Sequence, residues 1–170
     1  MKAHRPFVSY GIIVFLLSLN AYTLHAQSKT EEKILYKGNP SSSISSSVTV
    51  PASRSYYFSA GTTGPVADST AKEGTYERFG NTYQQSIGIL ERFKTALTAE
   101  GLGLKDVVFM RVYVAPDKKT GETDFKGWFD AYAKYFGTKE NPTKPARSTI
   151  GVASLVNTDK FIEIEIVVAY

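Results

Sequence analysis

Two stretches near the C-terminus place charged side chains among apolar neighbours. Arg147 opens "RSTIGVA" directly after Pro145 and Ala146, and Glu163 and Glu165 alternate with isoleucines in "FIEIEIVVA". Both stretches are typical of β-strands. Charges on a largely apolar sheet face indicate a subunit interface or a lined cleft, because burying an isolated charge is costly. A guanidinium in such a place is a candidate for holding a substrate, and an ion pair with one of the glutamates is the alternative.

The residue types available for other chemistry are restricted. The chain has no cysteine, and its two histidines, His4 and His25, lie in the leader described next. This excludes Cys-His and Ser-His-Asp catalysis and the usual zinc and copper ligand sets from the mature chain, so no metal site is expected. Chemistry must rest on carboxylates, Arg, Lys, Tyr, hydroxyls, backbone groups and water. Without disulfides, stability must come from packing and assembly.

The N-terminal segment has the layout of a secretory signal peptide. Lys2 and Arg5 precede an uncharged run from Pro6 to Gln27, whose most apolar part is "GIIVFLLSL". We expect residues 1–26 to be removed by cleavage after Ala26, and the protein to be exported, periplasmic or secreted. An uncleaved membrane anchor is the alternative, and no membrane association is expected after cleavage.

Charge and composition indicate how the chain after the leader is organised and which partners it is not expected to bind. Loss of the leader removes two of the 20 basic residues and none of the 16 acidic ones, so the net charge falls from +4 to +2. Lysines are scattered among acids without an aromatic-rich basic stripe, so nucleic acid is not an expected partner. Residues 27–43 are polar and predict a flexible tether. Residues 44–170 are long enough for one domain.

Hydrophobic periodicity predicts the elements of this domain. Apolar positions from Phe79 to Leu97 recur at three- and four-residue spacing and indicate an amphipathic helix that ends at Gly101. An aromatic stripe from Phe125 to Phe136 predicts a second helix. The predicted elements are a hairpin at 46–51 and 55–61, a helix at 75–100, a strand at 106–115, a helix at 125–136, and strands at 147–153 and 161–169.

The order β-β-α-β-α-β-β leaves two helices that each need a sheet to cover an apolar stripe. We therefore expect an α+β domain with both helices packed on one face of a mixed β-sheet. Side chains alternate along a strand, so the isoleucines of the last strand face the helices. The other sheet face is expected to carry Glu163, Glu165 and Arg147.

The same stretches carry a resemblance to a known family. "PARSTIGVASL" followed by "FIEIEIVVA" resembles the C-terminal signature of the RidA family, also called the YjgF family. "AEGLGLKDVVFMRVYVAPD" and "FDAYAKYFG" resemble its central strand and second helix, and the resemblance covers residues 44–170. It implies a chorismate-mutase-like (RidA-like) fold and a homotrimer with ligand clefts between subunits. It also implies cofactor-independent hydrolysis of 2-imino acids to 2-oxo acids and ammonia.

The resemblance assigns roles to individual residues. Arg147 is the signature arginine, whose planar fork can grip a carboxylate through two parallel hydrogen bonds. Glu163 is the glutamate that helps to place the attacking water, and is the expected catalytic residue. The backbone of Thr149 would face the same pocket. Ala60 and Gly61 occupy the positions of the family's Ser-Gly pair.

Three positions depart from the deaminase pattern. Ser47 falls at or beside a usual tyrosine, Ala60 replaces the serine, and Phe129 replaces an asparagine of the second helix. The first functional hypothesis is an imine/enamine deaminase-type hydrolase. The alternative is a non-catalytic trimer that binds a small carboxylate-bearing metabolite in the same cleft, because Arg147 is retained while polar neighbours are lost.

Overall fold

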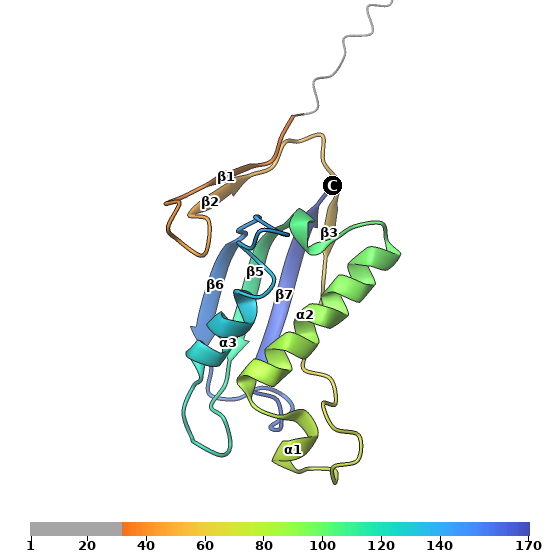
Figure 1. Ribbon diagram of the computed structural model, residues 1–170, viewed down its shortest axis with the longest axis vertical. Helices are drawn as coiled ribbons and strands as arrows, with labels where there is room; N and C mark the ends of the chain where they lie inside the picture. The colour runs from red at the N-terminus through yellow and green to blue at the C-terminus, as the bar shows by residue number, and fades with distance from the viewer. Residues whose placement is uncertain (1–31) are drawn as a thin grey trace, which may run out of the picture. The chain divides into compact units, whose positions relative to one another are not determined.

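A five-stranded mixed sheet lies at the centre of the computed structural model, which describes residues 32–170 (Figure 1). The central strands follow the order β3-β7-β5-β6, and β4 also pairs with β7. β5 is parallel to β6 and antiparallel to β7. The elements are β1 (Leu35–Lys37), β2 (Ser47–Thr49), β3 (Tyr56–Phe58), β4 (Thr62–Thr63), α1 (Tyr76–Phe79), α2 (Thr82–Ala99), the 3-10 turn η1 (Leu104–Asp106), β5 (Val107–Val114), α3 (Phe125–Tyr132), β6 (Ala146–Gly151) and β7 (Ile162–Ala169).

The helices α2 and α3 cover one face of this sheet (Figure 1). Alternate side chains of β7 face the helices, and Ile162, Ile164 and Ile166 are fully or almost fully buried. They pack with buried residues of α2 and α3 such as Leu90 and Trp128 in one hydrophobic cluster. The prediction of an α+β domain with two helices on one face of a mixed sheet is confirmed.

The predicted helix over 75–100 is interrupted. Gly80 has a φ of 70°, in the left-handed region that glycine adopts readily, and it ends α1. Asn81 then caps α2, since its side chain accepts a hydrogen bond from the backbone N–H of Gln84 at 2.9 Å. The Gln84 side chain accepts from the Asn81 backbone at 3.0 Å, which completes a capping box. The second helix is shorter than the predicted 125–136, because turns follow Tyr132.

The predicted hairpin between 46–51 and 55–61 is wrong. β2 pairs with β1 in a separate two-stranded sheet, and β3 pairs with β7. β1 lies within the segment predicted as a tether, where the Tyr36 hydroxyl donates to the Val107 carbonyl at 3.2 Å. Pairing with β7 lets Tyr57 pack against the core, whereas the serine-rich β2 offers little apolar surface.

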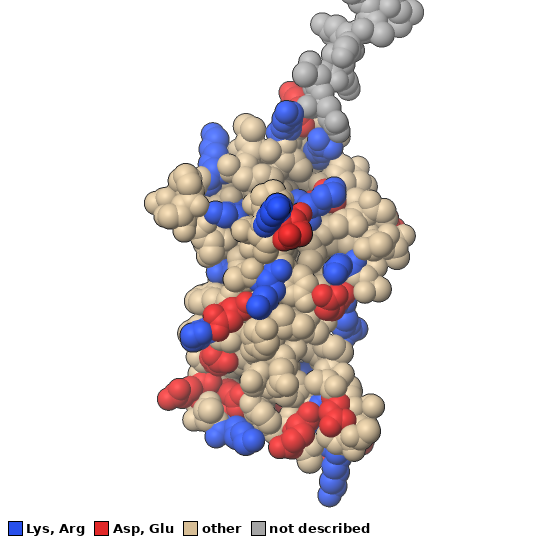
Figure 2. Space-filling view, in the orientation of Figure 1, with Lys and Arg blue, Asp and Glu red and all other residues tan. Residues whose placement is uncertain are grey.

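The predicted leader and its cleavage site lie outside the described residues. Among residues 32–170, no helix is long and apolar enough to cross a membrane. On the face seen in Figure 2, Lys and Arg side chains are interspersed with Asp and Glu.

Candidate functional site

Arg147 lies on the helix-covered face of the sheet, in the edge strand β6. The register places Arg147 beside Met110 of β5, and Met110 beside Ile166 of β7. Met110 and Ile166 are buried beneath the helices. Paired residues in neighbouring strands project to the same face. The expectation that Arg147 shares a face with Glu163 and Glu165 is therefore wrong. The β5–β6 register aligns Arg147 with the buried Met110, and the two glutamates align with residues on the other face of β5.

Three aromatic rings of α3 surround the Arg147 guanidinium. Its carbon Cζ lies 4.2 Å from the ring centroid of Tyr132, 5.0 Å from that of Phe129 and 5.4 Å from that of Trp128. The Nη1 atom is buried and has no hydrogen-bond partner among the described residues. Burial lowers the pKa of the Arg147 guanidinium from its ordinary value. The site is thus a cation held by ring faces, with unused capacity to donate hydrogen bonds.

Neighbouring hydrogen bonds fix the rings around this cation. The indole Nε1 of Trp128 donates to Thr149 Oγ1 at 3.2 Å, and the Tyr132 hydroxyl donates to the Ser43 carbonyl at 3.0 Å. Burial raises the pKa of Tyr132 to about 12, so its hydroxyl is protonated at neutral pH. Asp124 caps α3 by accepting from the Gly127 N–H at 2.8 Å. The rings are therefore held by both the sheet and the preceding loop.

The backbone of Thr149 faces the open edge of β6. The Pro145 carbonyl accepts from the Ser45 N–H outside the sheet, whereas the Val152 N–H donates to the Val114 carbonyl inside it. Backbone groups alternate along a strand, so odd-numbered residues of β6 direct theirs outward. Thr149 thus presents its main chain at the edge next to Arg147 while its side chain supports α3.

Glu163 lies on the opposite face of the sheet. It pairs with Tyr113 of β5 and Thr63 of β4, three register positions from the row that contains Arg147. A Cβ atom added to Gly61 would lie 1.9 Å from Glu163 Oε1, so the carboxylate rests directly against this glycine. The Glu163 carboxylate makes no hydrogen bond or ion pair with any described residue. The structure thus groups Glu163 with Gly61 and the adjacent Ala60.

The uncovered face also contains an ion pair that the sequence analysis did not identify. Arg111 Nη1 lies 2.8 Å from Glu165 Oε2, and its guanidinium carbon lies 5.9 Å from the ring centroid of Phe109. Arg111 and Glu165 are far apart in sequence, and only the β5–β7 register brings them together. Phe58 on this side is 71% exposed, and Ile150 is also exposed. Glu165 therefore already has a partner on its own face.

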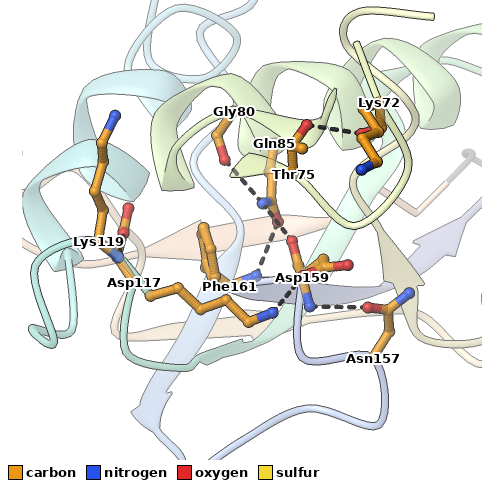
Figure 3. Close-up of polar contacts among 10 residues, drawn as sticks. Lys72, Thr75, Gly80, Gln85, Asp117, Lys119, Asn157, Asp159 and Phe161 are labelled. Atoms are coloured by element: carbon orange, nitrogen blue, oxygen red, sulfur yellow. Dashed lines mark hydrogen bonds and ion pairs between the residues drawn. The ribbon is translucent and has the colours of Figure 1, made fainter. Parts of the chain in front are cut away.

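A buried glutamine fixes the segment that leads into β7 (Figure 3). Gln85 Nε2 donates to the carbonyls of Gly80 and Asp159, each at 3.1 Å. Its Oε1 accepts from the Phe161 N–H at 2.9 Å. This side chain thereby sets the start of the strand that carries Glu163.

The other candidate residues lie in different places. Phe129 of α3 lies beside the Arg147 guanidinium, and Thr149 lies in the same strand as Arg147 and accepts from Trp128 of α3. Ser47 lies in the two-stranded sheet opposite Lys37. Residues 32–170 contain no group of three or more acidic side chains placed to hold a metal ion.

The mixed sheet with two helices on one face has the YjgF fold, as similar solved structures show. The chain resembles the YjgF gene product of E. coli with a TM-score of 0.51 and 28% identity, over 70% of this chain and 83% of that one. It resembles E. coli TdcF with bound serine with a TM-score of 0.51 and 27% identity, over 71% of this chain and 84% of that one.

Residues 44–170 match the family described as Endoribonuclease L-PSP. The chain belongs to this family, which confirms the RidA/YjgF resemblance. A RutC family protein of Saccharolobus solfataricus is 37% identical over 87 residues, which cover 51% of this chain and 61% of that protein. A RutC family protein of Pyrococcus horikoshii is 36% identical over 86 residues, again covering 51% of this chain and 60% of that protein. The matches thus span less than two thirds of these relatives' lengths.

Proposed function

We propose that this protein is an imine/enamine deaminase-type hydrolase that converts 2-imino acids to 2-oxo acids and ammonia. The observation that carries the proposal is the Arg147 guanidinium, which is enclosed by rings and has a buried, unpartnered Nη1. A partly buried cation with an unpartnered, buried nitrogen and no acidic partner is unfavourable unless a ligand supplies the opposite charge. A substrate carboxylate is such a ligand, and its planar geometry suits the guanidinium fork.

Two further observations support a carboxylate at this place. The main chain of Thr149 offers additional hydrogen-bonding groups at the open edge beside Arg147. E. coli TdcF, which shares the fold at 27% identity, was solved with bound serine, an amino acid that carries a carboxylate. A 2-imino acid has the same carboxylate next to its reacting carbon.

A second copy of the chain completes the proposed site. Arg147 and Glu163 lie on opposite faces of one sheet, so they cannot both contact a small substrate within one copy. In a homotrimer with clefts between subunits, Arg147 of one copy meets Glu163 of a neighbour. The exposed Phe58 and Ile150 supply apolar surface on the uncovered face for this assembly.

In the proposed reaction, Arg147 fixes the carboxylate and Glu163 orients the water. Water adds to the imine carbon while the Glu163 carboxylate accepts a proton from it and returns one to the nitrogen. The tetrahedral carbinolamine then passes its hydroxyl proton to the amino nitrogen through the same carboxylate, and ammonia leaves as the C–N bond breaks and the C=O bond forms. Gly61 allows the carboxylate to lie close to the strand because it has no side chain.

Mixed trimers test this arrangement. Chains with Arg147→Ala and Glu163→Gln, carrying different tags, are co-expressed, and trimers containing both are isolated. Ammonia release from freshly generated 2-iminopropanoate is then followed. Each pure variant should be inactive, whereas a mixed trimer has one cleft with both groups intact and should recover about one third of wild-type activity. Mixed trimers as inactive as the pure variants would refute the shared cleft, and a wild type at the uncatalysed rate would refute the deaminase.

Binding without turnover is the second candidate function. It is favoured by the lack of any hydrogen-bond partner for the Glu163 carboxylate among the described residues, and by Ala60 and Phe129 in place of polar residues. Thermal stabilisation by pyruvate that is lost in Arg147→Ala, together with no ammonia release by the wild type, would support it.

A further inference from the structure

We propose that Phe129 and Phe125 form an aromatic subsite beside Arg147, so that the preferred ligand is a carboxylate with an aromatic substituent. This inference rests on the proposed carboxylate-binding role of Arg147 and adds the class of substituent. It does not depend on whether the bound acid is turned over.

Both rings are exposed at the outer side of α3. Phe129 is 44% exposed and Phe125 is 37% exposed, whereas Trp128 and Tyr132 of the same helix are buried in the core. The two phenyl rings are stacked, with centroids 6.5 Å apart and an interplanar angle of 20°. Phe125 and Phe129 therefore form a pair of neighbouring, exposed rings on α3 that are not buried in the core.

This surface begins at the guanidinium and follows the end of β6. The Phe129 centroid lies 5.0 Å from Arg147 Cζ. At the other end, a Cβ added to Gly151 would lie 3.3 Å from Phe125 Cζ, so this ring rests against bare backbone. The two rings thus extend alongside the edge strand from Arg147 to Gly151.

The geometry suits a ligand with a carboxylate at one end and a ring at the other. A carboxylate paired with the guanidinium lies within hydrogen-bonding distance of its nitrogens. Its substituent then falls in the range of roughly 4.5–7 Å over which aromatic rings interact with Phe129. A methyl or ethyl substituent covers little of this surface, whereas a phenyl or indole ring covers much of it. The preference is therefore for the larger, planar group.

Position separates these rings from the other exposed aromatics. Phe58 and Tyr56 lie in β3, on the side of the molecule assigned above to assembly. Phe129 of α3 lies next to the Arg147 guanidinium, whose Nη1 has no hydrogen-bond partner among the described residues, and Phe125 stacks on Phe129. A ligand held by Arg147 is thus the occupant with the most direct access to them.

The inference can be tested with two carboxylic acids, one of which carries a phenyl ring while the other does not. Dissociation constants of propanoate and 3-phenylpropanoate are measured by calorimetry for the wild type, Phe129→Leu and Tyr170→Leu. Tyr170 is a matched control because it is half exposed, bonds through its backbone to Ser55, and lies at the C-terminus. The wild type should bind 3-phenylpropanoate about tenfold more tightly than propanoate. Phe129→Leu should reduce this ratio to about threefold or less, and Tyr170→Leu should keep it.

Each outcome bears on one of the two proposals. Equal affinity of the wild type for both acids, or a ratio unchanged in Phe129→Leu, overturns the aromatic subsite and leaves the carboxylate site intact. A loss of the ratio in Tyr170→Leu as well overturns it too, because the effect would not be local. If the wild type binds neither acid more tightly than Arg147→Met does, the carboxylate site itself is wrong and the subsite fails with it. Phe125→Leu is a second variant that should also lower the ratio.

Discussion

Replacing Gly61 with alanine should displace the Glu163 carboxylate while leaving the fold intact. The new Cβ would lie 1.9 Å from Glu163 Oε1 and 2.8 Å from its Cδ, whereas real Cβ contacts essentially never fall below 3.0 Å. The carboxylate oxygen must therefore retreat by about 1 Å. It is the far end of a flexible side chain without other described partners, so the movement costs little stability.

The expected effect on catalysis is much larger than that on folding. A displacement of about 1 Å in a reacting group can reduce the rate roughly 100-fold. Gly61 is not among the glycines with positive φ, so alanine is compatible with its backbone and can even stabilise the chain by about 0.5 kcal/mol. Ammonia release should thus fall about 100-fold while the thermal midpoint changes by no more than a few degrees.

Gly103 provides the matched control for this variant. It has an extended backbone with a φ of −153°, and a Cβ there would meet its nearest neighbour at 3.8 Å, an ordinary contact. Gly103→Ala should therefore keep full activity. Wild-type activity in Gly61→Ala would refute the reasoning, since it would show that the reaction does not depend on where Glu163 lies. A large loss of thermal stability would refute the claim that only the side chain moves.

Other substitutions test the cation, its supports and a buried lysine. Arg147→Met should weaken carboxylate binding at least 100-fold by calorimetry, without lowering the thermal midpoint, because it removes a partly buried charge that has no acidic partner but keeps apolar volume. Thr149→Val should cost about 1–2 kcal/mol in denaturant unfolding, because the buried Trp128 Nε1 loses its acceptor. Burial lowers the pKa of Lys160, whose ammonium donates to the Gly64 carbonyl, to about 8 from 10.5. The unfolded chain then holds this proton more tightly, so the free energy of unfolding should rise between pH 8 and 10.5 by about 2–3 kcal/mol more in the wild type than in Lys160→Met. Parallel pH curves for the two proteins would contradict that assignment.

The two helices and the strands they cover could be predicted from sequence because burial imposes a period on each of them. The three- and four-residue spacing from Phe79 to Leu97 marks α2, and the alternation in "FIEIEIVVA" correctly separates the buried isoleucines from Glu163 and Glu165. Glycine and asparagine are common at helix ends, so Gly80 and Asn81 are a sequence signal for the break between α1 and α2. The start of α2 at this point also depends on Gln84, which completes the capping box with Asn81.

Strand partners could not be predicted in the same way. Local turn residues favoured a hairpin between the second and third strands, but the edge of β7 offered β3 better apolar contacts. The Arg111–Glu165 ion pair likewise depends on register between strands more than 50 residues apart. No local pattern encodes such a register, because it is set by how whole faces pack.

By itself, the sequence determined which reactive side chains are available: an arginine and a glutamate on C-terminal strands, and no cysteine or histidine after residue 26. It also determined the α+β class, because periodicity is a property of each segment. Only the tertiary structure decided that Arg147 lies beneath the rings of α3 and Glu163 against Gly61, on opposite faces of one sheet. The reason is physical: the phase of each strand follows from its partner's register, and a shift of one residue moves every side chain to the other face.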